Sequence, residues 1–555
     1  MQIIKCLTAL AVILSPVLIF GQTTYLPEGA KENHFIERME IKQGKNTDLN
    51  FSSLKPYSRR AIVNAAQQWD SLNRAAGLTL SAVDQYNLHS LLMNNSEWVS
   101  GSKESFLSKK PVLKSFYVTQ PNLLEVNTKD FFLAVNPVLS LQFGAESGND
   151  QSLLYNKRGI EVRGRIANKI GFSTMLSDNQ ERGPLFFNDY VNEHRAVPGA
   201  GFYKKFKSDK GFDYFDASGY VTFNVTKYID VQFGYDKNFI GDGYRSLFLD
   251  DVGSRYLFLK LNTRIWKFNY ENIFMELMPQ YTKAGDNLLD RKYSAMHHLS
   301  LNVTKWLNVG LFEGVVFGRK NHFDFQYLNP IIFLRHVEGT VGSPDNALAG
   351  IDFKANAAKK FQFYGQLLLD EFLLKEITSN SGYWANKYGY QLGVKYVDAF
   401  GINNLDLQLE SNRVRPFTYS HYDSVANYTH YNQPLAHPLG ANFQEFVGVL
   451  RYQPAPKWSV NARAIYYEKG FDSTGANFGG DPFKLYTTRT KQFDNTVGDG
   501  VNTKVFNAAV TLGYELRQNL FLEGNFLFRK ATGFDNTSLF NIGIRWNAAR
   551  RDYNY

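Results

Sequence analysis

Aromatic and hydrogen-bonding side chains are concentrated in the long connecting segments of the second half of the chain. An aromatic face stacks on the C–H face of a sugar ring, while amides, imidazoles and guanidinium groups pair with its hydroxyls. Compact loops also use aromatics for their own packing, so the composition leaves sugar contact and loop packing as open alternatives. The residues selected as carbohydrate contacts are Tyr383, Trp384, Arg415, Tyr419, Tyr422, Tyr431 and His437.

Residue patterns typical of catalytic sites are missing from the sequence. It contains no G-x-S-x-G, H-E-x-x-H, P-loop or dinucleotide-binding glycine pattern. His297 and His298 are adjacent, so in a strand they point to opposite faces and cannot share a metal ion. The many carboxylates are most simply salt-bridge partners. We therefore expect a protein that is not an enzyme and that has no catalytic residues, no metal and no cofactor.

One loop contains carboxylates that could bind a metal ion. Asp472, Asp481, Asp494 and Asp499 lie in a glycine-rich segment, 470–503, and carboxylate oxygens are ligands that Ca²⁺ prefers. Their spacing does not fit an EF-hand, so a solvated loop is the simpler interpretation. Ca²⁺ in this segment stays an alternative.

The composition narrows the class of protein. The 555 residues are 44% hydrophobic, 15% aromatic and 20% charged, with 45 Phe, 33 Tyr and 43 Gly. This aromatic content excludes a disordered chain. A mean hydropathy of −0.33, with no long uncharged apolar run, excludes a bundle of membrane helices. An aromatic- and glycine-rich chain that is polar on average is typical of an outer-membrane β-barrel.

The first residues have the pattern of a secretory signal peptide. Lys5 precedes an apolar stretch, and Gly21 is a small residue suited to cleavage, so residues 1–21 are assigned to the signal. Its removal lowers the formal charge from +9 to +8 (9 − 1) and removes Cys6, the only cysteine. The remaining basic excess has no basic cluster with interleaved aromatics. It therefore favours anionic lipopolysaccharide or acidic glycans over nucleic acid as partners.

Residues 22–128 show the period of helices and are predicted to form a small bundle on the periplasmic side of the barrel. Gly77 follows where the first clear helix would end, and Ser81 with Asp84 resembles a capping box that opens a second helix. The face predicted to be buried consists of Ile62, Ala65, Ala66, Trp69 and Leu72.

Residues 129–555 show a hydrophobic period of two, in segments of about ten residues separated alternately by short turns and long loops. This is the pattern of an all-β transmembrane barrel of about 18 antiparallel strands. The predicted strands lie near 131–146, 155–167, 169–178, 211–224, 227–238, 253–264, 266–280, 292–303, 306–318, 348–356, 360–371, 386–397, 402–413, 444–453, 457–469, 504–516, 519–530 and 538–547. Glu276 and Glu313 resist the scheme, because both fall on the apolar side of their strands.

The polar side of the predicted strands, which faces the lumen, carries charges of both signs. An ion-selective pore favours one sign at its constriction, whereas mixed charges pair with each other and with inserted loops. A barrel of this size is otherwise wide enough for a water-filled channel. We therefore expect a lumen filled by side chains and folded-in loops, with 319–347 and 414–443 as the closing loops. A diffusion porin remains the alternative.

Four segments together give the chain a family resemblance: 234–251 (GYDKNFIGDGYRSLFLDD), 327–353 (YLNPIIFLRHVEGTVGSPDNALAGIDF), 363–372 (FYGQLLLDEF) and 429–443 (THYNQPLAHPLGANF). They resemble the Wzi-like capsule-assembly outer-membrane family, and more closely its members in gliding bacteria, which include the gliding-motility protein RemB. The resemblance implies a barrel with a periplasmic helical bundle that acts as a surface lectin and attaches capsular polysaccharide to the outer membrane. A surface component of the gliding or adhesion machinery, with motility proteins as partners, is the alternative.

Polar residues within these segments are predicted to hold loops rather than to bind ligand. A tight turn at the outer rim is expected to bring Arg245 to an inward carboxylate, and Asp370 is expected to pair with Arg335. Two further turns are expected to fix a plug loop. The residues given this structural role are Asn238, Asp242, Arg245, Asn329, Arg335, Asp345, Asn346, Asp370 and Glu371.

Overall fold

The computed structural model describes residues 23–44, 53–206, 211–281, 288–331 and 333–555. The predicted signal peptide, 1–21, lies outside the described residues. None of the helices in the described ranges is long and apolar enough to cross a membrane.

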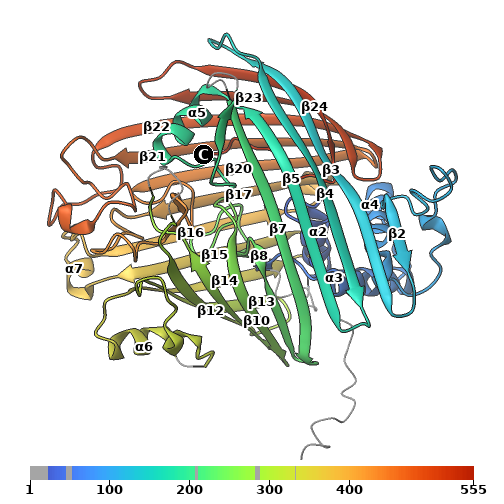
Figure 1. Cartoon of the computed structure of the whole chain (residues 1–555), viewed down its shortest axis with the longest axis horizontal. Helices are drawn as coiled ribbons and strands as arrows, with labels where there is room; N and C mark the ends of the chain where they lie inside the picture. Colours follow the sequence, from blue (N-terminus) through green and yellow to red (C-terminus); the bar gives the residue numbers. More distant parts are fainter. Residues whose placement is uncertain (1–22, 45–52, 207–210, 282–287, 332) are drawn as a thin grey trace, which may run out of the picture.

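The alternating segments form a closed antiparallel barrel (Figure 1). Each long strand pairs with the next one along the chain, and β24 pairs with β3 to close the cylinder. In the described part of the chain the cylinder has eighteen strands, which confirms the predicted number and order. The strands are β3 (Phe131–Glu146), β4 (Leu153–Ile166), β5 (Ile170–Arg182), β7 (Gly211–Thr226), β8 (Ile229–Asp236), β10 (Tyr256–Ile265), β11 (Phe268–Leu277), β12 (Lys292–Asn302), β13 (Leu307–Phe317), β14 (Asn346–Ala357), β15 (Phe361–Glu371), β16 (Lys387–Tyr396), β17 (Leu405–Val414), β20 (Phe443–Ala455), β21 (Trp458–Phe471), β22 (Val501–Arg517), β23 (Leu520–Ala531) and β24 (Thr537–Trp546).

The two faces of the barrel wall differ as the alternation requires. On β24, Phe540, Ile542 and Ile544 are exposed on the outside, whereas Asn541 and Arg545 are buried in the lumen. Large apolar side chains are exposed in the same way on strands all around the cylinder. An apolar belt around a polar interior is what a barrel needs in order to sit in lipid.

The connections differ in length at the two ends of the barrel. At one end short turns join the strands, and Trp266, Trp306 and Trp458 are exposed beside them. Tryptophan at such positions is typical of a membrane–water interface. At the other end the strands are joined by long loops, which include 183–203, 237–255, 318–345, 372–386, 415–442 and 472–500.

Helices α2 (Glu32–Gln43), α3 (Arg59–Ala75) and α4 (Ala82–Asn94) lie at the short-turn end (Figure 1). Ser81 caps α4 by accepting a hydrogen bond from the Asp84 backbone N–H (2.9 Å), and Gly77 adopts a φ of 66° just after α3. On the predicted face of α3, Ile62, Ala65, Ala66 and Trp69 are buried, but Leu72 is exposed. The buried face therefore ends one turn earlier than predicted. Two short 3₁₀ helices, η1 (Ser96–Trp98) and η2 (Glu104–Phe106), and strand β2 (Leu124–Asn127), which pairs with β3, lead into the barrel.

Buried ion pairs join the helices to the barrel. Arg38 of α2 lies between Asp84 of α4 and two barrel residues, Asp398 at 3.0 Å and Asp406. Lys354 of the wall pairs with Glu40 of α2 at 3.1 Å. Each of these charges compensates the charge of a partner that is also removed from water. The ion pairs therefore fix the position of the helices on the barrel.

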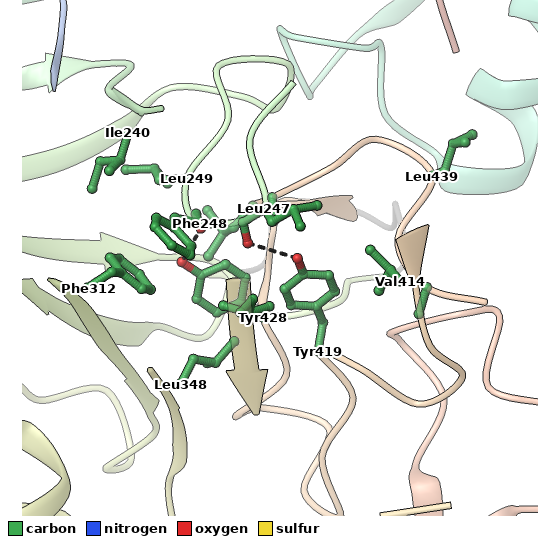
Figure 2. Close-up of a cluster of buried hydrophobic side chains, with 14 of the residues drawn as sticks. Ile240, Leu247, Phe248, Leu249, Phe312, Leu348, Val414, Tyr419, Tyr428 and Leu439 are labelled. Carbon is green, nitrogen blue, oxygen red and sulfur yellow. Dashed lines mark hydrogen bonds between the residues drawn. The ribbon is translucent and has the colours of Figure 1, made fainter. Parts of the chain in front are cut away.

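Three long loops and the last residues of the chain fold into the lumen. They are 183–203 with helix α5 (Leu185–His194), 237–255 with β9 (Phe239–Ile240), 415–442 with β18 (Thr429–His430) and β19 (Gln433–Pro434), and 547–555. Figure 2 shows where two of these loops meet: the Tyr428 hydroxyl donates to the Phe248 carbonyl at 2.6 Å, and Phe248 stacks on Phe312 of β13 at 4.5 Å. The expectation that loops fold into the lumen is confirmed.

The end of the chain is anchored inside the barrel (Figure 1). Glu181 of β5 accepts hydrogen bonds from Arg551 and from the Tyr553 hydroxyl, both at 2.8 Å, and Arg550 lies 2.7 Å from Glu523 of β23. The mixed charges of the lumen wall therefore serve to bind inserted segments.

Candidate functional site

An aromatic surface lies at the long-loop end of the barrel, where three loops meet: 372–386, 415–442 and 472–500. It is called here the aromatic patch. Its members come from all three loops, so no single stretch of sequence contains the whole patch. They are Tyr383, Trp384, His421, Tyr422, Tyr486, Arg489 and Phe493.

Trp384 is the centre of the patch. Its ring lies 4.7 Å from that of Tyr486, and the Arg489 guanidinium lies 4.2 Å from its ring centroid. Only 9% of Trp384 is exposed, whereas Tyr422 and Phe493 are exposed by 43% and 47%. Trp384 therefore forms the floor of the patch, and the other two rings offer the accessible faces.

The indole N–H of Trp384 is buried and has no hydrogen-bond acceptor among the described residues. Buried donors in folded proteins nearly always have a partner, from the protein, from ordered water or from a ligand. The protein covers this nitrogen, so the groups that a ligand can reach are the exposed ring faces of the patch. These faces suit the apolar face of a sugar ring.

Backbone pairing between two loops fixes the position of Trp384. The Trp384 N–H donates to the Gln492 carbonyl at 3.1 Å, and the Asn495 N–H donates to the Gly382 carbonyl at 2.9 Å. Gly382 adopts a φ of +64°, and an added Cβ would lie 2.7 Å from the Cα of Asp494. Only glycine fits this crossing of the two backbones.

Arg415 ties the loops together and does not point to the surface as a free donor. Its guanidinium donates to the carbonyls of Asn386 at 2.8 Å, Asn495 at 3.2 Å and Tyr383 at 3.4 Å. Nε and Nη2 of Arg415 are thus directed to main-chain oxygens, and contact between this residue and sugar hydroxyls stays a prediction.

Two titratable rings of the patch, those of His421 and Tyr486, are uncharged near neutral pH. Burial, reinforced by the charge of Lys387, lowers the pKa of His421 to about 4. Burial, with the nearby carboxylate of Glu371, raises the pKa of Tyr486 to about 12. Both rings are therefore neutral around pH 7, and contact with a ligand depends on stacking and neutral hydrogen bonds, with Arg489 as the charged group of the patch.

Two predicted carbohydrate contacts are buried inside the protein. Tyr419 is in the lumen cluster of Figure 2, where its hydroxyl donates to the Leu247 carbonyl at 2.8 Å. His437 is also fully buried, and its Nε2 lies 2.7 Å from Glu445. The assignment of these two residues to surface contact was wrong, because the 415–442 loop reaches the surface near Tyr422 and folds inward on both sides of it.

Tyr431 lies away from the aromatic patch. Its ring packs 4.9 Å from that of Tyr281, and its backbone N–H donates to the Met278 carbonyl. Gly201 lies against the same ring, because an added Cβ there would be 2.7 Å from it. The structure thus brings Tyr383, Trp384 and Tyr422 together and places Tyr431 among other loops.

The predicted rim turn at Asn238, Asp242 and Arg245 is not at the rim, because the 237–255 loop runs down into the lumen. Arg245 lies 3.4 Å from Glu445, which confirms that it meets an inward carboxylate. Asp242 pairs with Lys354 of the wall at 3.3 Å. These residues hold a loop, as predicted, but at a deeper level.

The same loop reaches the helical region. Asn238 accepts a hydrogen bond from Lys260 at 2.8 Å. Strand β9 then pairs with β1 (Leu54–Lys55), and the Gly241 N–H donates to the Ser53 carbonyl at 2.8 Å. One continuous loop thus connects the long-loop end of the barrel to the helices at the other end.

The loop between β13 and β14, 318–345, does not plug the lumen, contrary to the prediction for 319–347. Helix α6 (Leu334–Thr340) packs on the outward-facing side chains of the wall. Asp345 holds the base of this loop by accepting two hydrogen bonds from Arg319, at 2.6 and 2.7 Å. Asn346 is the first residue of β14. Asn329 forms the expected turn by accepting from the Ile331 N–H at 3.1 Å.

Asp370 does not pair with Arg335. Asp370 and Glu371 both pair with Lys387, at 3.0 and 3.1 Å, and Asp370 also accepts from the Tyr419 N–H at 2.8 Å. Arg335 is on the outside of the wall and pairs with Glu338 of its own helix. Asp370 and Arg335, which were predicted to pair, therefore lie on opposite sides of the barrel wall.

Tyr486, Arg489 and Phe493 were not predicted as ligand contacts, because the sequence of their loop suggested only a Ca²⁺ site. Among the described residues no group of three or more His, Cys, Asp or Glu side chains is arranged to hold a metal ion. The carboxylates of this loop make separate turns: Asp481 accepts from the Phe483 N–H at 2.9 Å, and Asp499 pairs with Lys491 at 3.1 Å. The aromatic residues between them were the available signal.

Comparison with known families gives a match for residues 267–525. The matched family is that of the capsule assembly protein Wzi. The matched region runs from the start of β11 into β23 and contains all three loops of the aromatic patch. No curated protein matches the chain.

The chain also matches solved structures. Wzi of Escherichia coli, described as an outer-membrane protein involved in group 1 capsule assembly and a carbohydrate-binding β-barrel, is 13% identical, with a TM-score of 0.56 and coverage of 94% of this chain and 99% of that one. OprD of Pseudomonas aeruginosa is 11% identical, with a TM-score of 0.42 and coverage of 78% and 98%. OccAB4 of Acinetobacter baumannii is 10% identical, with a TM-score of 0.41 and coverage of 76% and 98%.

At 13% identity the likeness to Wzi shows the fold alone. A closed eighteen-stranded barrel with an apolar exterior is an outer-membrane barrel, and the protein is therefore located in the outer membrane. The similarity to the family members of gliding bacteria stays a prediction.

Proposed function

We propose that this outer-membrane barrel binds surface or capsular polysaccharide through the aromatic patch, and that it attaches the polysaccharide to the cell surface without catalysing a reaction. The single observation that carries the proposal is the exposure of aromatic ring faces around the floor formed by Trp384, at the point where three loops meet. Tyr422 and Phe493 present these ring faces, and they are exposed by 43% and 47%. A sugar ring supplies an apolar C–H face that stacks on them.

The comparisons support this proposal from an independent direction. The region matched by the Wzi family contains the three loops that build the patch. The Escherichia coli protein with the same fold is described as carbohydrate-binding and as involved in capsule assembly. In this proposal the long loops face the outside of the cell, and the helices of residues 22–128 face the periplasm.

The proposed function also involves outer-membrane lipid and requires neither a cofactor nor Ca²⁺. The protein works without a cofactor, because the patch offers binding groups and no bound group is needed for stacking. Lipopolysaccharide and other outer-membrane lipids are its surroundings as well as partners. Ca²⁺ is not part of the proposal, because Asp472 and Asp499 pair with lysines and Asp481 accepts a hydrogen bond within a turn.

The inserted loops bear on the porin alternative. Loops 183–203, 237–255 and 415–442, together with residues 547–555, occupy the lumen and pair with its charged wall. A diffusion porin needs a continuous water path, so these insertions favour binding over transport. A role in gliding motility or adhesion is the second candidate function, and the experiment below distinguishes it from glycan binding.

The experiment uses fluorescent capsular polysaccharide from the producing cells, and measures its retention by intact cells that carry wild-type or variant protein. Trp384→Ala is expected to lose most of the retention. Trp384→Phe, which keeps an aromatic ring in the floor, is expected to retain more polysaccharide than Trp384→Ala.

The matched control is Trp266→Phe, at the short-turn end, which is expected to retain polysaccharide like wild type. Heat-modifiable migration on SDS gels shows that each variant is folded. Equal retention by wild type, Trp384→Ala and Trp384→Phe would overturn the assigned site. Loss of surface spreading in cells that retain polysaccharide normally would instead favour the motility role.

A further inference from the structure

The loop between β13 and β14 covers part of the outer wall of the barrel that would otherwise face lipid. On β13, Phe312 and Val316 belong to the lumen cluster, so the alternating residues Val315 and Phe317 face outward. These outward side chains are buried nevertheless, because Tyr327 and helix α6 lie against them. Tyr327 stacks on Phe317 at 4.5 Å.

The covered area contains a polar pair that the sequence pattern could not accommodate. Glu313 faces outward and lies 2.9 Å from Nδ1 of His297, which faces outward on β12. Glu313 is six residues from Leu307, the first residue of β13, which corresponds to about 20 Å along the strand. Because the strands of such a barrel are tilted, Glu313 lies about 15 Å from the short-turn edge of an apolar belt that is about 25 Å tall. An unpaired carboxylate at that level would carry a large cost in lipid.

Helix α6 removes this group from lipid. The second oxygen of Glu313 accepts a hydrogen bond from the Leu334 N–H at 2.9 Å, at the first residue of α6. Leu334 and Val337 of α6 are buried against the wall. The base of the loop is fixed by Arg319 and Asp345. The loop is therefore a built part of the outer wall.

The outer side of this loop is apolar where an extracellular loop in water would be polar. Phe325, Ile331 and Phe333 are exposed by 79%, 83% and 74%. They follow each other along the loop just before α6, and Arg335 is exposed beside them. A long basic side chain next to apolar residues can extend its charge toward the headgroup region while its methylenes stay in the apolar layer.

The surface of the loop is continuous with the lipid-facing belt. Helix α6 contacts both β13 and β14, and the outward residue Ile351 of β14 is exposed as part of that belt. Figure 1 shows α6 at the side of the barrel, at the end opposite to helices α2–α4. At that end the belt meets the outer leaflet if the helices face the periplasm, as proposed above.

We propose that the β13–β14 loop is embedded in the outer leaflet, where Phe325, Ile331 and Phe333 contact lipid acyl chains and Arg335 reaches the headgroups. The loop thus replaces the strand wall as the lipid-facing surface over β11–β13 and shields the His297–Glu313 pair. This role depends on the membrane location of the barrel and is independent of polysaccharide binding.

The test measures the depth of single labelled positions in membranes. In the full chain with Cys6→Ser, a bimane label is attached at Phe333→Cys and, separately, at Phe325→Cys. The protein is reconstituted in phosphatidylcholine vesicles with acyl chains that carry bromine, which quenches only within the apolar layer. Iodide in the buffer reports exposure to water.

Two control positions calibrate the result. Ile351→Cys on β14 marks a lipid-facing site, and Ser424→Cys in the 415–442 loop marks an exposed site at the outer end. Labels at 333 and 325 are expected to be quenched by the brominated lipid at least half as strongly as the label at 351, and to be protected from iodide. The label at 424 is expected to show the reverse.

Two results would overturn the proposal. Iodide quenching at 333 and 325 as strong as at 424 would mean that the loop lies in water. Protection from both quenchers, with cross-linked dimers through position 333, would mean that a second copy of the chain covers the loop. Heat-modifiable migration confirms folding of each labelled variant, and the two positions allow the test to proceed with either one.

Discussion

Gly382→Ala is expected to disrupt the aromatic patch without changing any side chain in it. Gly382 has a φ of +64°, and the added methyl group would lie 2.7 Å from the Cα of Asp494 and 2.8 Å from the backbone N of Asn495. The left-handed conformation alone costs an alanine about 1–2 kcal/mol. The contact with backbone atoms cannot be relieved by rotation of a side chain, so the two loops must separate.

The separation breaks the hydrogen bonds from the Asp494 N–H to the Ser381 carbonyl and from the Asn495 N–H to the Gly382 carbonyl, each 2.9 Å long. Trp384 then loses its fixed position above Tyr486. If polysaccharide binding requires the closed arrangement, a cost of about 1–2 kcal/mol corresponds to about 5- to 30-fold weaker binding, since about 1.4 kcal/mol is tenfold. The close contact of the added methyl group with the Asp494 backbone adds to this free-energy cost.

The assay is isothermal titration of detergent-solubilised protein with capsular oligosaccharide. Gly475→Ala is the matched control, because Gly475 lies in the same 472–500 loop with a φ of +78° but has no atom within 4 Å of an added Cβ. The control is expected to change affinity by less than about 3-fold, since exposed loop strain relaxes locally. Equal affinities for Gly382→Ala, Gly475→Ala and wild type would refute the reasoning that this backbone crossing organises the site.

Three further predictions concern the helices, the pH response and the lumen. Arg38→Met removes the buried cation beside Asp406, whereas Asp398 keeps Lys42 at 3.0 Å, so the denaturant midpoint of the helical region should fall by an amount equivalent to about 3 kcal/mol, as measured by helical circular dichroism. The pKa of His421 is lowered from 6.5 to about 4, so the folded state binds fewer protons than the unfolded state in that window. Its contribution to patch stability is therefore complete above about pH 6.5 and is lost as the pH falls toward 4; oligosaccharide affinity should decline in step, and His421→Gln should lose this pH dependence. Deletion of residues 550–555 removes two arginines and two tyrosines from the lumen, and single-channel conductance in planar bilayers should rise above that of wild type; an unchanged conductance would show that the tail does not obstruct a path.

The barrel could be predicted from the sequence because its pattern is local. Every strand alternates between residues that face lipid and residues that face the lumen, as Phe540, Asn541 and Ile542 do on β24. That alternation follows from the geometry of an extended chain and needs no knowledge of distant partners. The ion pair between Arg245 and an inward carboxylate was predictable because the lumen wall was expected to carry carboxylates, although the turn that contains Arg245 was expected at the outer rim.

The positions of the loops could not be predicted, because they depend on contacts between distant segments. Loop 237–255 enters the lumen through pairing with β1, almost 200 residues away, and loop 318–345 turns outward because Glu313 and His297 need a cover. The misplaced Glu313 was the visible sign of this cover, but a single residue on the wrong side of a strand does not say what covers it.

The candidate site was predicted only in part for a related reason. Tyr383, Trp384 and Tyr422 were predicted as ligand contacts because aromatic residues within a polar loop indicate a binding surface even when that loop is considered alone. Tyr419 is only three residues from Tyr422, yet it is buried in the lumen, and Tyr486 comes from a loop selected for its carboxylates. The sequence does not reveal which side of a loop turns inward, because burial there is decided by the tertiary fold.

The most direct test of the account is the affinity of purified protein for capsular oligosaccharide, compared between wild type and the double variant Tyr422→Ala/Phe493→Ala. Both changes remove exposed ring faces, and they leave the floor formed by Trp384 in place. The account predicts a loss of at least tenfold in affinity, with the barrel folded and heat-modifiable. Unchanged affinity in the folded double variant would contradict the claim that this patch holds the polysaccharide.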